Sequence, residues 1–86
     1  MDDYSITFAK SARKELEALS NPLIKRIFSR IEALADSPRP SGCKKLKGSE
    51  DLWRIRIGDY RVVYSIDDNG QVVDVIAVRH RSQAYI

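Results

Sequence analysis

The chain has 86 residues, with 15 Lys and Arg against 12 Asp and Glu and a formal net charge of +3. This length fits one domain, residues 1–86, with a modest hydrophobic core. Cys43 is the only cysteine, which excludes a disulfide within the chain and fits a reducing cytoplasm. The sequence has no signal-peptide pattern and no apolar run near the roughly 20 residues of a membrane span, so we expect a soluble cytoplasmic protein.

The first half of the sequence predicts one strand followed by two helices. Residues 4–8 (YSITF) alternate in polarity and favour a strand. Residues 12–19 form a short helical pattern with apolar residues on one stripe. Asn21-Pro22 indicates the start of a second helix, because Asn caps helices and Pro is accepted in their first turn. Apolar residues spaced by three and four then continue to Ala35, before a loop that contains two prolines.

The second half predicts three strands, at residues 52–57, 60–66 and 72–78, which are rich in Val, Ile, Tyr and Trp. Gly58-Asp59 and Asn69-Gly70 separate them as hairpin turns. The predicted fold is therefore α+β with the order β-α-α-β-β-β, a helical hairpin packed on one face of a small, mainly antiparallel sheet. The other face of this sheet is open, and we expect functional side chains there.

The first predicted hairpin separates apolar from basic side chains. A two-residue turn at Gly58-Asp59 places Arg56 opposite Arg61 and Arg54 opposite Val63, and residues directly opposite each other share a face. The intervening residues are apolar and form the core face; they are Trp53, Ile55, Ile57, Tyr60, Val62 and Tyr64. We therefore expect Arg54, Arg56 and Arg61 together on the open face.

A regular second hairpin, built on Asn69-Gly70, extends this arrangement. Its expected pairs are Ile66–Val73, Tyr64–Val75 and Val62–Ala77 on the core face, and Val63–Ile76 and Arg61–Val78 on the open face. His80 has the parity of Val78, so we expect it to join the arginines. Arg81 and Tyr85 follow the regular strand, where alternation does not fix their direction.

A group of guanidinium side chains favours phosphate as its ligand, since Arg binds phosphate through two parallel hydrogen bonds. RNA can be cut at such a site if a base activates the ribose 2′-OH and an acid protonates the leaving oxygen. His80 is the only histidine, and histidine titrates near neutral pH, so we expect it to be the base. Tyr85 would stack on a nucleobase or give a proton. Ordinary exposed strand arginines and an idle surface histidine would produce the same sequence pattern.

Other kinds of site find no support in the sequence. One His, one Cys and scattered acids offer no metal-ligand spacing, and there is no glycine-rich phosphate loop and no nucleophile elbow. We therefore expect no metal and no cofactor, which leaves a metal-free mechanism as the nuclease route.

Three stretches resemble the RelE/ParE toxin superfamily: residues 45–48 (KLKG), 52–64 (LWRIRIGDYRVVY) and 78–85 (VRHRSQAY). The resemblance covers nearly the whole chain. RelE-type members are messenger RNA interferases that act in the ribosomal A site. Their basic catalytic residues match Arg54, Arg56, Arg61 and Arg81, and their base-stacking tyrosine matches Tyr85. The type member has lysines at the first two positions, and arginine here favours His80 as the base.

The resemblance also implies partners. A cognate antitoxin would cover the toxin, and the ribosome with its messenger RNA would contact further basic residues, including Lys44, Lys45 and Lys47, through their phosphates. The alternative is a ParE-like toxin, which shares the fold but poisons DNA gyrase and is not a nuclease. The combination of arginines, His80 and Tyr85 favours the nuclease.

Overall fold

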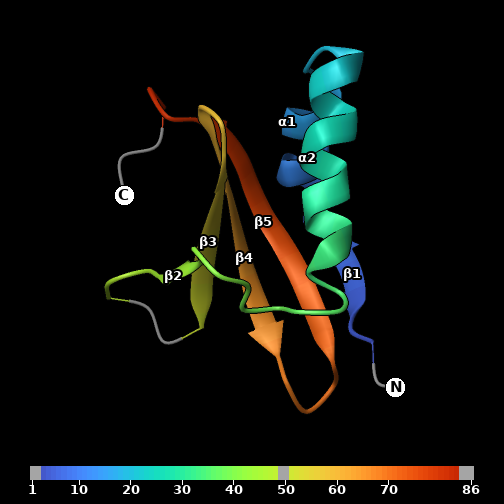
Figure 1. The fold of residues 1–86 in the computed structure, drawn as a ribbon, viewed down its shortest axis with the longest axis vertical. Helices are drawn as coiled ribbons and strands as arrows, with labels where there is room; N and C mark the ends of the chain where they lie inside the picture. Colours follow the sequence, from blue (N-terminus) through green and yellow to red (C-terminus); the bar gives the residue numbers. More distant parts are fainter. Residues whose placement is uncertain (1–2, 49–50, 84–86) are drawn as a thin grey trace.

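The computed structural model describes residues 3–48 and 51–83 (Figure 1). Its elements confirm the predicted order and add one short strand between the helices and the hairpins. They are β1 (Ser5–Phe8), α1 (Lys10–Glu17), α2 (Asn21–Ala33), β2 (Lys44–Lys45), β3 (Leu52–Ile57), β4 (Tyr60–Asp67) and β5 (Val72–His80). β2 consists of two lysines, which have no strand pattern in the sequence. It is a strand because its backbone pairs with β3.

The strands form one sheet in the order β1-β5-β4-β3-β2. β1 runs parallel to β5, and the other neighbours are antiparallel, as expected of a mainly antiparallel sheet. Both helices lie on one side of this sheet in Figure 1, where α2 runs along it and α1 lies behind α2. No helix within the two described ranges has the length and apolar character needed to cross a membrane.

The core lies between the helices and one face of the sheet. α1 contributes Ala12 and Leu16 and α2 contributes Ile27 and Ile31, all buried, in accordance with the predicted apolar stripes. The buried residues that the sheet adds to this cluster are Ile55, Ile57, Val62, Tyr64, Val73, Val75 and Val78. Because strand residues alternate between faces, this set leaves the intervening side chains of β3, β4 and β5 on the face away from the helices.

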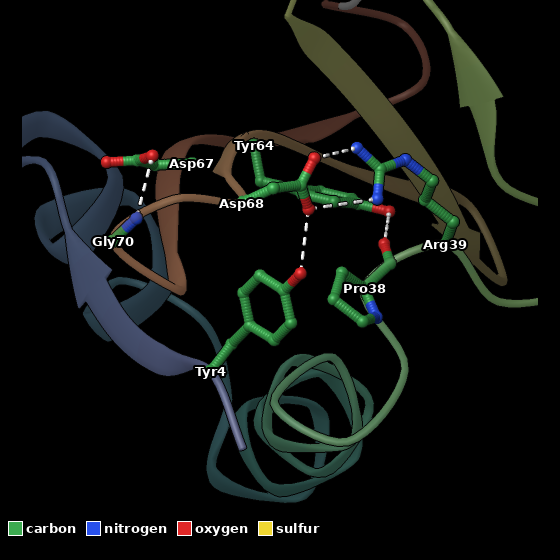
Figure 2. Close-up of polar contacts among 7 residues, drawn as sticks. All are labelled: Tyr4, Pro38, Arg39, Tyr64, Asp67, Asp68 and Gly70. Atoms are coloured by element: carbon green, nitrogen blue, oxygen red, sulfur yellow. Dashed lines mark hydrogen bonds and ion pairs between the residues drawn. The ribbon is translucent and has the colours of Figure 1, made fainter. Parts of the chain in front are cut away.

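A polar cluster joins three distant segments at the end of the sheet where β4 turns into β5 (Figure 2). Asp68 in that turn accepts a hydrogen bond of 2.7 Å from the Tyr4 hydroxyl and forms an ion pair of 2.9 Å with Arg39, which follows α2. The Arg39 guanidinium also lies 5.1 Å from the centre of the Trp53 ring on β3. These contacts fix the loop between α2 and β2 across the sheet end.

Tyr64 anchors the same loop from inside the core. Its ring is fully buried and its hydroxyl donates a hydrogen bond of 2.8 Å to the backbone oxygen of Pro38 (Figure 2). Burial and the neighbouring Cys43 thiol raise the pKa of the Tyr64 hydroxyl, so it remains a donor across the physiological pH range. The buried aromatic ring thus has its one polar atom satisfied.

Candidate functional site

Three arginines share the open face of the sheet, as the sequence predicts. Arg56 on β3 lies directly opposite Arg61 on β4. Arg54, two residues before Arg56 on β3, lies opposite Val63 on β4. The two-residue turn at Gly58-Asp59 produces this register, and Gly58 adopts a positive φ of 60° there. Arg56 is exposed, while Arg54 and Arg61 are partly buried.

The charges of these arginines act on one another. The pKa of Arg54 is lowered from its ordinary value, first by burial and then by the positive charges of Arg61 and Arg56. Arginine stays protonated despite such a shift, so the face retains its positive charge. A set of cations that destabilise one another is relieved by a bound anion, which makes this face a candidate anion site.

The second hairpin departs from the expected register. The pairs Ile66–Val73 and Tyr64–Val75 are confirmed, but a bulge follows. Ile76 is the extra residue, since Val63 pairs with Ala77 and not with Ile76. Beyond it, Val62 pairs with Val78 rather than Ala77, and Arg61 pairs with Arg79 rather than Val78. A bulge opposes two residues to one, which shifts the alternation of all later side chains on that strand.

The prediction that His80 joins the arginines is therefore wrong. His80 lies opposite Tyr60, whose neighbours Val62 and Tyr64 at alternate positions face the helices. The His80 and Tyr60 rings meet edge to face, with centroids 5.2 Å apart and an interplanar angle of 85°. His80 lines a groove of about 510 Å³ on the α1 side, together with Glu15, Ala18, Leu19, Tyr60, Val78, Ser82 and Gln83.

The His80 ring is held by the residues that follow β5. Its Nδ1 accepts a hydrogen bond of 3.1 Å from the Ser82 backbone N–H and lies 2.8 Å from the Ser82 hydroxyl. Because a backbone N–H can only donate, Nδ1 is an acceptor here and a neutral ring carries its proton on Nε2. A substrate hydroxyl that gives its proton to Nδ1 would first have to displace the contacts of Ser82 with this atom.

Arg79 takes the place opposite Arg61 on the open face that the sequence assigned to Val78. It lies across from Arg61, which itself lies across from Arg56, so the three arginines form a row over β5, β4 and β3. The sequence does contain one sign of the bulge. The buried valines of β5 are Val73, Val75 and Val78, and their spacing changes from two residues to three. Ile76 and Ala77 mask it, because both are apolar.

Arg81 lies beside the β3–β4 turn. Its backbone N–H donates a hydrogen bond of 2.7 Å to the Asp59 carbonyl, and its Nε lies 3.8 Å from the Asp59 carboxylate. The side chain is 65% exposed, so it can reach a ligand at the edge of the arginine face. Tyr85, the predicted base-stacking residue, lies outside the described residues.

The predicted RNA-binding lysines lie at the opposite edge of the sheet from β1. Lys44 and Lys45 form β2, Lys47 follows it, and all of them are exposed. Lys44 pairs with Arg54 and shares its face, whereas Lys45 pairs with Trp53 and points to the other side. Lys44 thus extends the basic face. Within residues 3–48 and 51–83, no cluster of His, Cys, Asp and Glu side chains could hold a metal ion.

The chain matches the family model described as the ParE toxin of the type II toxin–antitoxin system, over residues 6–85. It is 33% identical over 86 residues to the mRNA interferase toxin RelE of Escherichia coli K12, covering 95% of this chain and 90% of that protein. It is 33% identical over 84 residues to toxin RelE3 of Methanocaldococcus jannaschii, covering 93% of each chain.

Solved structures agree with these sequence matches. The archaeal RelE–RelB complex from Pyrococcus horikoshii contains a chain with a TM-score of 0.82 and 30% identity, covering 98% of this chain and 100% of that one. The isolated E. coli RelE toxin gives a TM-score of 0.81 at 28% identity, covering 95% and 88%. The chain therefore belongs to the RelE/ParE superfamily and is a toxin of a type II toxin–antitoxin system, of the RelE kind.

Proposed function

We propose that this toxin is an endoribonuclease that cuts messenger RNA in the ribosomal A site without a metal ion. The observation that carries the proposal is the group of arginines on the open face, in which Arg56 lies opposite Arg61 and Arg54 lies two residues away on the same strand. Burial, and after it the charges of Arg61 and Arg56, lowers the pKa of Arg54. Preorganised guanidinium groups stabilise the charge that develops on phosphorus-bound oxygens in the transition state. The arginines are therefore assigned to charge stabilisation.

The proposed reaction uses the RNA's own ribose as nucleophile. The 2′-oxygen attacks the adjacent phosphorus and the bond from phosphorus to the 5′-oxygen breaks, which leaves a 2′,3′-cyclic phosphate and a free 5′-OH. The 2′-OH proton passes to a base and an acid protonates the 5′-oxygen, so the reaction needs no redox partner. The groups it needs are cations, a base and an acid, all of which side chains can provide.

His80 remains the proposed base, although it lies on the α1 side of the sheet and not among Arg54, Arg56 and Arg61, so the RNA would have to bend around the end of β5 for its 2′-OH to reach the ring. It ends β5, directly before Arg81, and its acceptor atom is the Nδ1 that contacts Ser82. The substrate would displace Ser82 from Nδ1, and the 2′-OH would then donate to this atom. Arg81 supplies a further positive charge at the edge of the face, and Tyr85 is proposed to stack on the substrate base.

The relatives support the substrate and the partners. The E. coli protein that is 33% identical is named an mRNA interferase, and the structure from P. horikoshii is a complex of RelE with RelB. We therefore infer a cognate antitoxin as the protein partner, and the ribosome with its messenger RNA as the target. Lys44, Lys45 and Lys47 are proposed to contact RNA phosphates, which would make binding salt-dependent.

A second function has one specific observation in its favour. The family model that matches residues 6–85 is described as the ParE toxin. The resemblance to ParE-like toxins implies poisoning of DNA gyrase. The basic face is compatible with both functions, since it would attract any polyanion. The two functions leave different traces in a cell, because only the nuclease creates new RNA ends.

The experiment that tests the proposal is primer extension on cellular messenger RNA after the toxin is induced. The wild type should create new 5′ ends within coding regions, and an Arg61→Ala/Arg81→Ala double variant should create none at the same protein level. Supercoiling by purified gyrase, measured in parallel, should be unaffected by the wild type. Growth arrest without new RNA ends, together with inhibited supercoiling, would reject the nuclease and establish the gyrase poison.

A further inference from the structure

The arginine row continues onto β5, beyond the residues that the resemblance to the superfamily assigns. Arg56, Arg61 and Arg79 lie in line across β3, β4 and β5. Building on the proposed nuclease function, we propose that Arg79 binds a phosphate of the RNA beside the scissile one. In the same proposal, Glu15 on α1 is the positioning residue that holds the Arg79 guanidinium in place.

The row concentrates positive charge at a position where a sheet ordinarily avoids it. Like charges directly opposite each other destabilise an antiparallel pair, and this sheet has two such pairs in succession. Neighbouring strands are about 4.8 Å apart, so side chains in line across three strands span about 10 Å. A row of this length can contact an extended polyanion at more than one phosphate group.

Glu15 reaches Arg79 because β1 is shorter than β5. β1 pairs with β5 from Val72 to Val75 and then ends, so α1 lies against the rest of that edge of β5. There the Glu15 carboxylate accepts a hydrogen bond of 2.9 Å from the Val78 backbone N–H and one of 3.0 Å from the Arg79 Nε. One side chain thus satisfies a backbone donor at the sheet edge and fixes the next residue's guanidinium.

The ion pair also has the exposure that a binding role requires. The Arg79 side chain is 38% exposed and the Glu15 side chain 30% exposed, so the pair is neither buried nor freely solvated. A guanidinium held through its Nε has a defined plane, and a defined plane lowers the entropy lost when arginine binds a phosphate. Glu15 therefore acts on the substrate through Arg79 rather than by contact.

The test measures single-turnover cleavage of a short message on programmed ribosomes, with one phosphate at a time replaced by an uncharged methylphosphonate. Arg79→Met, which keeps the aliphatic stem, should slow cleavage about tenfold, the usual effect of losing one charge-assisted hydrogen bond. Neutralising the phosphate that Arg79 contacts should slow cleavage by the wild type by a similar factor. The same replacement should leave the cleavage rate of Arg79→Met unchanged. Arg13→Met removes a charge from an exposed pair on α1 and should respond to every replacement like the wild type.

Glu15→Asp tests the positioning role, since it keeps the charge but withdraws the carboxylate by one methylene group. It should slow cleavage several-fold when Arg79 is present and have no effect in the Arg79→Met background. An equal effect in both backgrounds would show that Glu15 is merely structural and overturn its role. Thermal unfolding of each variant checks that it is folded.

Two further outcomes separate this inference from the proposed function. If the wild type cleaves and Arg61→Ala does not, but Arg79→Met matches the wild type at every methylphosphonate position, Arg79 has no role and the nuclease remains. If the wild type cleaves no message at all, both proposals are rejected.

Discussion

Arg61 on β4 lies directly opposite Arg79 on β5, and the second of these arginines is tied to Glu15 on α1 through an ion pair of 3.0 Å. The pairing depends on Ile76, the extra residue of the bulge between Val75 and Ala77. Without a bulge, alternation would place Val78 opposite Arg61 and His80 on the arginine face. Bulges often re-aim side chains beside functional sites, and this one exchanges a histidine for an arginine.

The bulged register makes a prediction about stability. Val78 is 3% exposed and belongs to the core cluster, whereas a regular hairpin would place it on the open face. Val78→Ala should therefore lower the free energy of unfolding by about 2 kcal/mol in urea denaturation, the size of a large-to-small core substitution. Val63→Ala, on the open face, is the matched control and should cost about 0.5 kcal/mol. Equal costs for the two valines would contradict the register.

The role of His80 makes a prediction about rate. His80→Gln should slow cleavage of a ribosome-bound message at saturating toxin by roughly 10²-fold, as expected when a general base is lost. Ser82→Ala removes the hydroxyl that lies 2.8 Å from Nδ1 but keeps the backbone contact, so this variant should cleave at a rate close to that of the wild type. An unchanged single-turnover rate in His80→Gln would mean that another group is the base.

The ion pair of Asp68 and Arg39 makes a prediction about pH. The pKa of Asp68 is held below its ordinary value, first by the hydrogen bond from Arg39 and then by that from Tyr4. A carboxylate with a lowered pKa in the folded state stabilises the fold above its unfolded pKa, near about 3.9, and this stability is lost as the pH falls through the folded pKa. Asp68→Asn should therefore melt at a lower temperature than the wild type at pH 7.

This difference between Asp68→Asn and the wild type should shrink as the pH falls below about 4, in melting curves followed by circular dichroism. The effect should be small, because the pair is solvent-exposed and screened by salt. Two melting-temperature curves that stay parallel from pH 7 to pH 2 would show that Asp68 contributes no charge-dependent stability.

The turn before β4 makes a prediction about backbone conformation. Gly58 has a φ of 60°, and a Cβ added there would meet the Arg26 guanidinium at an ordinary distance of 3.7 Å. Gly58→Ala should thus be destabilised by about 1 kcal/mol through left-handed strain and not through a clash. Gly58→Asn should recover part of this loss, because Asn tolerates the left-handed region. Urea denaturation compares the two, and equal stability of Ala, Asn and Gly would contradict the turn geometry.

The sequence predicts the first hairpin in full and the second only in part, and the difference is physical. In residues 52–64, arginines alternate with apolar residues around a turn that contains glycine, so a slip by one residue would bury charge. In residues 72–80, Ile76 and Ala77 are both apolar and either could face the core. Polarity therefore indicates no register there, and the fit of Val78 against the helices decides it.

The sequence by itself determined the order of all elements except β2 and the open face with Arg54, Arg56 and Arg61, because each follows from local periodicity or turn chemistry. Only the tertiary structure decided which residues at the end of β5 join that face. The contacts of Glu15 with Arg79 and of Tyr4 with Asp68 join residues 64 positions apart. Such contacts leave no local pattern, since they exist only once the helices have packed on the sheet.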